Sequence, residues 1–334
     1  MANPVLVEIT RGNVVESRHR GAISVVDSSG KTVLDIGDTA LPVFARSAIK
    51  AVQALPLVES GAAEALGFGD AELALACSSH SGEDAHIERA ASMLKKAGRS
   101  EEDLECGPHW ATQEKVLIHQ ARTFTSEPGA ICNNCSGKHA GFVCTAAHLG
   151  VDPKGYIRPE HSVMSAVKDA LEDVTGTLHH EDQCGMDGCS IPTYATPLTS
   201  MAHGFAKMGT GDGMGAERAK AAQRLVHACM AEPFYVAGTD RFCTRLMEMG
   251  QGRLFGKTGA EGVFCGAIPE LGLGIALKCD DGGTRASEAM MAAVIAHLLP
   301  QDDPLSAAVA QLAHPDISNR NNFKVGETRV HLPC

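Results

Sequence analysis

Ser47 and Lys50 are the first residues in the chain whose types and spacing suggest catalysis, and their neighbours over residues 44–56 are mostly apolar or small. Residues three apart lie on one face of a helix, so we expect the two side chains to be neighbours. A serine hydroxyl needs a base to accept its proton as it attacks, and a neutral lysine amine is such a base. Because a free lysine has a pKa of about 10.4, the chemistry requires burial or a second cation to lower that pKa. The alternative interpretation is a chance pair on a helix surface.

A second cation occurs in the last third of the chain, in Lys257-Thr258-Gly259 at the end of an expected strand. Ser-x-x-Lys at the start of the first long helix, together with Lys-Thr-Gly on a strand, is the arrangement of penicillin-recognising serine hydrolases. Lys257 beside Lys50 would favour the neutral form of one amine. The alternative for Lys257 is a solvated lysine in a turn. The third element of those enzymes, Ser-Asp-Asn, does not occur in the sequence, which argues against β-lactam chemistry.

The hydrophobic pattern predicts strands at both ends of the chain and helices between them. Short β-rich runs predict antiparallel strands over 4–37 and 253–279. Apolar residues at helical spacing predict helices over 138–149, 160–174, 196–208, 217–230 and 285–299. Ser81 and Asp84 have the spacing of a capping box for a further helix over 85–97.

These elements predict a single catalytic domain over residues 1–334, of the α/β (α+β) class. The N-terminal and C-terminal strands are expected to form one antiparallel sheet flanked by the first and last helices. Residues from about 84 to 250 are expected to form a mostly helical subdomain beside that sheet.

Composition and charge argue against several kinds of partner. The chain has 334 residues and a formal net charge of −11, so its surface would repel nucleic acid and anionic lipid. No apolar run is long enough to span a membrane, and the N-terminal residues do not have the pattern of a signal peptide. We therefore predict a cytoplasmic protein with a small-molecule substrate, and neither nucleic acid nor membrane as a partner.

Twelve cysteines are scattered along the chain, and most are expected to be reduced core residues. Two pairs differ because they lie among Gly, Asn and Asp in expected loops, and these are metal-ligand candidates. From the residues alone, the natural choice is a four-cysteine site made of Cys132, Cys135, Cys184 and Cys189.

Five longer motifs carry a resemblance to a known family. They are Arg46-Ser47-x-x-Lys50, Cys77-Ser78-Ser79-His80-Ser81-Gly82-Glu83, Asn134-Cys135-Ser136-Gly137-Lys138-His139, Met186-Asp187-Gly188-Cys189 and Gly256-Lys257-Thr258-Gly259-Ala260-Glu261-Gly262-Val263. Together they resemble the rhizobial-type, Rhizobium etli-like L-asparaginases of the asparaginase II family. The resemblance implies a fold like that of serine β-lactamases, penicillin-binding proteins and glutaminases. It also implies a homodimer that hydrolyses the side-chain amide of L-asparagine and makes little use of glutamine.

The resemblance also implies roles for individual residues. Ser47 with Lys50 would be the first serine-lysine tandem and Ser79 with Lys257 the second, Ser79 being chosen over Ser78 and Ser81. Ser47 would attack the amide carbon, Lys50 would take its proton, and backbone N–H groups near Ser47 would stabilise the oxyanion. Ser79 and Lys257 would keep Lys50 neutral and shuttle protons.

One zinc ion per subunit, near the active site, is implied as well, with Cys135, Lys138 and Cys189 as ligands and Asp187 near the open position. Lysine is an unusual ligand because it binds a metal only when deprotonated. His139 is an alternative nitrogen ligand, although we expect it to line the substrate pocket. Arg46 would pair either with the substrate carboxylate or with an acidic residue of the protein.

Two other functions remain open on the sequence. One is a penicillin-recognising serine hydrolase or esterase of the same fold. The other is a zinc-stabilised binding protein in which the serine-lysine pairs have no catalytic role. The asparaginase hypothesis is favoured because the motifs occur together.

Overall fold

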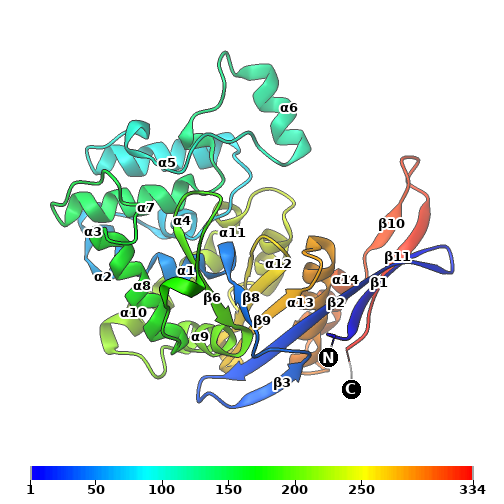
Figure 1. Cartoon of the computed structure of the whole chain (residues 1–334). Helices are drawn as coiled ribbons and strands as arrows, with labels where there is room; N and C mark the ends of the chain where they lie inside the picture. Colours follow the sequence, from blue (N-terminus) through cyan, green and yellow to red (C-terminus); the bar gives the residue numbers. More distant parts are fainter. Residues whose placement is uncertain (1, 333–334) are drawn as a thin grey trace.

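A computed structural model describes residues 2–332, and its centre is an antiparallel sheet built from the two ends of the chain (Figure 1). The strands run in the order β10-β11-β1-β2-β9-β8-β7, with β3 also paired to β2. Their bounds are β1 (Val5–Arg11), β2 (Val14–Asp27), β3 (Thr32–Ile36), β7 (Phe255–Thr258), β8 (Val263–Ile268), β9 (Leu273–Cys279), β10 (Asp316–Ser318) and β11 (Lys324–Val330). The predicted fold class is therefore confirmed. The sheet also extends past residue 279, where the sequence pattern predicted no strand.

Helices cover both faces of the sheet and form the separate helical region. They are α1 (Lys50–Gln53), α2 (Leu55–Glu59), α3 (Ala62–Ala65), α4 (Asp70–Ala76), α5 (Asp84–Lys96), α6 (Glu114–Thr123), α7 (Ser136–His148), α8 (Ser162–Thr175), α9 (Leu198–Thr210), α10 (Ala216–Ala231), α11 (Pro233–Val236), α12 (Phe242–Gly250), α13 (Thr284–Leu298) and α14 (Pro304–Ala313). The five helices predicted from periodicity are confirmed as α7, α8, α9, α10 and α13, and the helix predicted after the expected capping box is confirmed as α5. No described helix is long and apolar enough to cross a membrane.

Two local predictions need correction. The predicted capping box is wrong, because the Ser81 hydroxyl donates to the Ala237 carbonyl and Glu83 is the N-cap of α5. The helix predicted from residue 196 begins at Leu198. The residues before it form β6 (Pro192–Pro197), which pairs with β4 (Pro42–Phe44) and β5 (Cys184–Met186) in a small second sheet. Such short strands have no periodicity of their own, and pairing with distant segments is what stabilises them.

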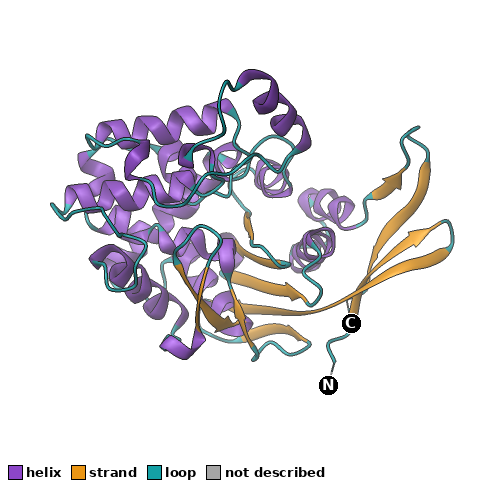
Figure 2. Ribbon diagram, turned by 45° about the horizontal axis from the view of Figure 1, so that its top comes forward, coloured by secondary structure: helices purple, strands orange, loops and turns teal. Residues whose placement is uncertain are grey.

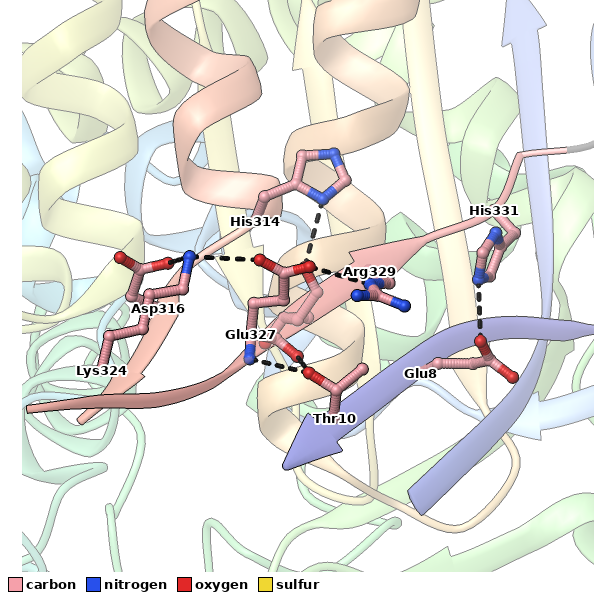
Figure 3. Close-up of polar contacts among 9 residues, drawn as sticks. Glu8, Thr10, His314, Asp316, Lys324, Glu327, Arg329 and His331 are labelled. Carbon is pink, nitrogen blue, oxygen red and sulfur yellow. Dashed lines mark hydrogen bonds and ion pairs between the residues drawn. The ribbon is translucent and has the colours of Figure 1, made fainter. Parts of the chain in front are cut away.

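The long strand β2 joins two different regions. Its C-terminal half is buried and pairs with β3 and β9, whereas its N-terminal half is mostly exposed and pairs with β1. With β10 and β11, this exposed half forms an arm that projects from the body (Figure 2). Polar contacts tie the arm together: Lys324 lies between Asp316 and Glu327, and the Thr10 hydroxyl contacts the Glu327 backbone (Figure 3).

Two glycines in the sheet show which helix covers each of its faces. A Cβ at Gly274 would lie 1.9 Å from the Ala202 carbonyl oxygen in α9, whereas one at Gly266 would meet Met291 of α13. Gly266 pairs with Ile275, the residue after Gly274, and successive residues of a strand point to opposite faces. Helices α9 and α13 therefore cover opposite faces.

The close approach of β9 to α9 predicts that Gly274→Ala is strongly destabilising. The new methyl group would overlap the helix backbone, so we expect a loss of about 3 kcal/mol in the free energy of unfolding. Chemical denaturation of the variant and the unchanged protein measures this loss. Gly209→Ala is the matched control, since its Cβ would have only ordinary contacts of 3.4 Å or more and the change favours the helix. Equal stability of the two variants would contradict the close approach.

Candidate active site

The Ser79 side chain lies between two buried lysines. Lys50 Nζ donates to Ser79 Oγ at 2.9 Å, and Lys257 Nζ lies 3.0 Å from the same oxygen. Lys50 begins α1, Lys257 belongs to β7, and Ser79 is in the loop between α4 and α5. The Ser79 N–H donates to the Val236 carbonyl at 3.0 Å, which fixes this loop against α11. Three segments that are distant in the chain thus meet at one hydroxyl group.

The two amines differ in their hydrogen bonds. Lys50 Nζ donates to three acceptors, Ser78 O at 2.5 Å, Ser79 Oγ and Cys135 Sγ at 3.0 Å, which uses the three hydrogens of an ammonium group. Lys257 Nζ contacts only Thr258 O at 2.9 Å and Ser79 Oγ among the described residues. Two such contacts are compatible with a neutral amine.

Burial and the nearby charge of Lys50 lower the pKa of Lys257 to about 7. Desolvation disfavours the ammonium form, and a second cation disfavours it further. The sequence analysis expected Lys50 to be the neutral amine. The structure instead gives the low pKa to Lys257.

Ser47 lies beside the end of the β7 strand. Residues Arg46–Ile49 form a short 3-10 helix, η1, and Arg46 has a φ of 51° in the left-handed region. A Cβ at Gly259 would lie 2.9 Å from the Ala45 carbonyl oxygen and 3.2 Å from the Ala48 nitrogen, so only glycine allows this contact. Ser47 is half-buried, and no hydrogen bond joins it to Lys50 among residues 2–332. Ser47 and Lys257 thus lie on the same side of the molecule.

Cys135, Lys138 and Cys189 form a second cluster that touches the first through Lys50. Lys138 Nζ lies 3.1 Å from Cys189 Sγ, and Cys135 Sγ accepts a hydrogen bond from Lys50. A hydrogen bond from Cys189, followed by the charges of Lys50 and Lys138, lowers the pKa of the Cys135 thiol well below its ordinary value. The hydrogen bond to Cys135 and burial raise the pKa of the Cys189 thiol well above its ordinary value. Burial opposes the charged form of Lys138, but the neighbouring Cys189 and Cys135 sulfurs and the Asp187 carboxylate outweigh it, and the pKa of Lys138 is raised. The cluster therefore carries thiolate character next to a buried cation.

Arg46 and Asp187 form an ion pair at the edge of this cluster, with Nε and Oδ1 2.8 Å apart. Arg46 was expected to pair either with the substrate carboxylate or with an acidic residue of the protein. The structure shows the acidic residue, Asp187. Burial raises the pKa of Asp187, but Lys138 and Arg46 outweigh it, and the net shift is downward. The carboxylate is therefore ionised and interacts with both Arg46 and Lys138.

His139 lies inside the protein, against aromatic rings. It is fully buried, its Nδ1 is 2.6 Å from the Tyr156 hydroxyl, and it packs edge-on against Phe142 and Tyr156. Its Nε2 has no partner among the described residues. Burial, with a contribution from Lys138, lowers the pKa of His139 well below its usual value, so the ring is neutral.

The structure does not assemble the four-cysteine alternative. Within residues 2–332, no group of three or more His, Cys, Asp or Glu with ligand atoms within 4.8 Å of one another contains any of these four cysteines. Cys184 instead contacts the Tyr194 side chain. Cys132 is buried in the core, where burial raises the pKa of its thiol.

His80, for which the sequence predicted no role, connects the two clusters. Its Nδ1 accepts from the Gly82 N–H, so its Nε2 carries the proton donated to Ser136 Oγ, 2.9 Å away. Its own N–H donates to the Asn134 carbonyl. His80 follows Ser79 and Ser136 follows Cys135, so this histidine holds the two loops together. In the sequence, the one indication of a role for His80 was its position in the serine-rich loop between Ser79 and Ser81.

Comparison with known proteins identifies the family. A family model described as L-asparaginase II matches residues 7–330. The match places the chain in a family of amide hydrolases. The chain belongs to the L-asparaginase II family.

Other comparisons found no curated protein that matches and several similar solved structures. One is Mglu, with 18% identity over 85% of this chain and 63% of that chain and a TM-score of 0.37. Another is described as a β-lactamase from Mycobacterium bovis, with 14% identity over 87% of this chain and 92% of that chain and a TM-score of 0.41. The chain spans less than two thirds of the length of Mglu.

Proposed function

We propose that the protein hydrolyses the side-chain amide of L-asparagine to L-aspartate and ammonia, with little activity on L-glutamine. Membership of the L-asparaginase II family supports amide hydrolysis. The observation that carries the proposal is the Ser79 hydroxyl held between Lys50 and Lys257, because one of these amines is poised to accept a proton near neutral pH.

In the proposed mechanism, Ser47 Oγ attacks the amide carbon. Its proton reaches Lys257 through Ser79, while Lys50, which donates to three acceptors, holds Ser79 in place. Proton return to the leaving nitrogen releases ammonia and leaves a β-aspartyl ester on Ser47, which water hydrolyses by the same proton path in reverse. Ser47 suits the nucleophile role because it is half-buried and so can be reached, whereas Ser79 is only 7% exposed and is bonded to both lysines.

The same proposal includes a zinc ion held by Cys135, Lys138 and Cys189. The donor types fit it: two sulfurs and an amine lie together in the interior, and thiolate character is already present at Cys135. Lys138, whose pKa is raised by the neighbouring sulfurs, would release a proton to solvent on binding. A bound zinc ion would supply a positive charge that orients a polar group of the substrate. Asp187 and Arg46 adjoin the cluster and would position the charged groups of the amino acid substrate. The homodimer and the Rhizobium etli-like character stay predictions from the resemblance, and the cytoplasmic location stays a prediction from the sequence pattern.

Loss of the nucleophile tests the central assignment. We expect Ser47→Ala to lower ammonia release from asparagine by about a thousandfold or more, because no covalent ester can form. The Ser78→Ala variant is the matched control, since the Ser78 hydroxyl is buried without a partner among the described residues. Undiminished turnover by Ser47→Ala would exclude Ser47 as nucleophile. Nitrocefin hydrolysis without asparagine turnover would favour the penicillin-recognising alternative.

The pKa of Lys257 predicts a pH dependence. Only the neutral form of Lys257 accepts a proton, and this form predominates at pH values above its pKa of about 7. We therefore expect kcat/KM for asparagine to rise with pH through about 7 and then level off. Lys257→Arg cannot supply a neutral base, so it should lose about a hundredfold or more in kcat together with this rise. A profile of the unchanged enzyme that is flat across neutral pH would contradict Lys257 as the base.

The metal content of purified variants tests the zinc ligands. We expect Cys189→Ser to lower the zinc content by one ion per chain, because a hydroxyl is a much poorer ligand than a thiolate. Cys184→Ser should keep its zinc, since Cys184 lies outside the cluster. Loss of zinc from Cys184→Ser instead would favour the four-cysteine site.

A further inference from the structure

A second group of possible metal ligands lies outside the site described above. His19 Nδ1 is 2.6 Å from Asp281 Oδ2, and Cys279 Sγ is 2.9 Å from Asp281 Oδ1. Within residues 2–332 this is the one set of three or more His, Cys, Asp or Glu whose ligand atoms all lie within 4.8 Å of one another. The set offers one nitrogen, one sulfur and one oxygen atom.

The pairing of β2 with β9 brings these residues together. Gly21 pairs with Cys279, and the antiparallel register continues because the Asp280 N–H donates to the Arg20 carbonyl at 2.9 Å. His19 therefore lies opposite Asp281. Alternate residues of a strand share a face, so all three side chains point to the face covered by α13. Gly21, which pairs with Cys279, lies on the same face, and a Cβ there would lie 3.2 Å from Met290 Cε of α13.

The group is buried on one side and open to solvent on the other. The His19 side chain is 7% exposed, whereas that of Asp281 is 49% exposed and opens toward solvent. Gly283 covers the group, and a Cβ there would lie 3.0 Å from Asp281 Oδ1 and 3.3 Å from His19 Nδ1. The Gly283 N–H also donates to Asp281 Oδ1.

The nearby charges are mixed. The Glu261 carboxylate lies beside Gly282, and Asp280 adjoins the group. The ammonium of Lys278 is bonded to the carbonyl oxygens of Glu261 and Cys279. Its hydrogens are therefore already directed to backbone acceptors.

We propose that His19, Cys279 and Asp281 form a zinc site that is separate from the cysteine-lysine cluster. Imidazole nitrogen, thiolate and carboxylate are the three ligand types that zinc takes from proteins, and a water molecule would complete four-coordination. Binding displaces the Cys279 thiol proton to solvent. The proton on His19 Nδ1 is displaced as well, and the ring takes it back on Nε2. Nε2 has no partner in the described part of the chain, so no hydrogen bond opposes this change of tautomer.

The position of the site gives it a structural role. The Cys279 N–H donates to the Gly262 carbonyl at 2.9 Å, and Gly262 closes the turn that follows Lys257-Thr258-Gly259. An ion held by β2 and the end of β9 would fasten this turn to the sheet and to the start of α13. The inference does not depend on the proposed reaction, because none of the three ligands belongs to the catalytic group.

Metal analysis of the full chain tests the site. Each protein is freed of metal with a chelator, dialysed against Zn²⁺ and analysed for zinc per chain. In a Cys189→Ser background, which removes the other cluster, we expect one bound ion. Adding Asp281→Asn should abolish binding, whereas adding Asp280→Asn should not, because the Asp280 carboxylate is bonded to Asn3 instead.

Other outcomes are equally decisive. Equal zinc binding by the Asp281→Asn and Asp280→Asn proteins, or none in the Cys189→Ser background, would overturn the site. If the double variants do not fold, the single changes serve: Asp281→Asn and Cys279→Ser should each hold one ion fewer than the unchanged chain. Equal content would overturn the proposal. Asparagine turnover is measured separately, so failure of the catalytic proposal would not be confused with failure of this one.

Discussion

Two lysine side chains buried against one hydroxyl group are the constraint on which the rest of the structure depends. Lys50 and Lys257 are both almost wholly inaccessible, and burying a charged group without partners is costly. The protein offsets this cost in two ways. Lys50 has three acceptors, one of them the Cys135 sulfur, and Lys257 has a pKa low enough to lose its charge near pH 7.

This constraint requires distant segments to converge with little room to move. The strand that carries Lys257 must lie directly against the turn that carries Ser47, and Gly259 allows that contact. The loop that carries Ser79 is fixed by backbone hydrogen bonds to Val236 and Asn134. Forming the sheet from both ends of the chain places β7 beside η1. The architecture thus positions the reactive groups more than any single motif does.

A series of charged and sulfur-containing side chains connects Arg46 with Lys50. Arg46, next to Ser47, pairs with Asp187, and the cluster of Lys138, Cys189 and Cys135 leads back to Lys50. Each buried cation therefore faces an anion or a polarisable sulfur. The contact between Lys50 and Cys135 means that the protonation of the sulfur cluster and that of the serine-lysine group influence one another. A metal at the cysteines would change the charge next to Lys50.

Local information in the sequence was enough to predict the fold class, the motif residues and five helices of the middle region, but not α6, α11 or α12. Apolar spacing is set by neighbours a few residues apart, which is why α8 and α10 were predicted to within two residues. The sequence could not show that Lys257 is the lysine with the lowered pKa, because the pKa depends on burial and on groups from other segments. Nor could it predict the small sheet of β4, β5 and β6, the partner of Arg46, or the group formed by His19, Cys279 and Asp281. These depend on strand register and side-chain approach between residues as much as 262 positions apart, which the folded chain alone establishes.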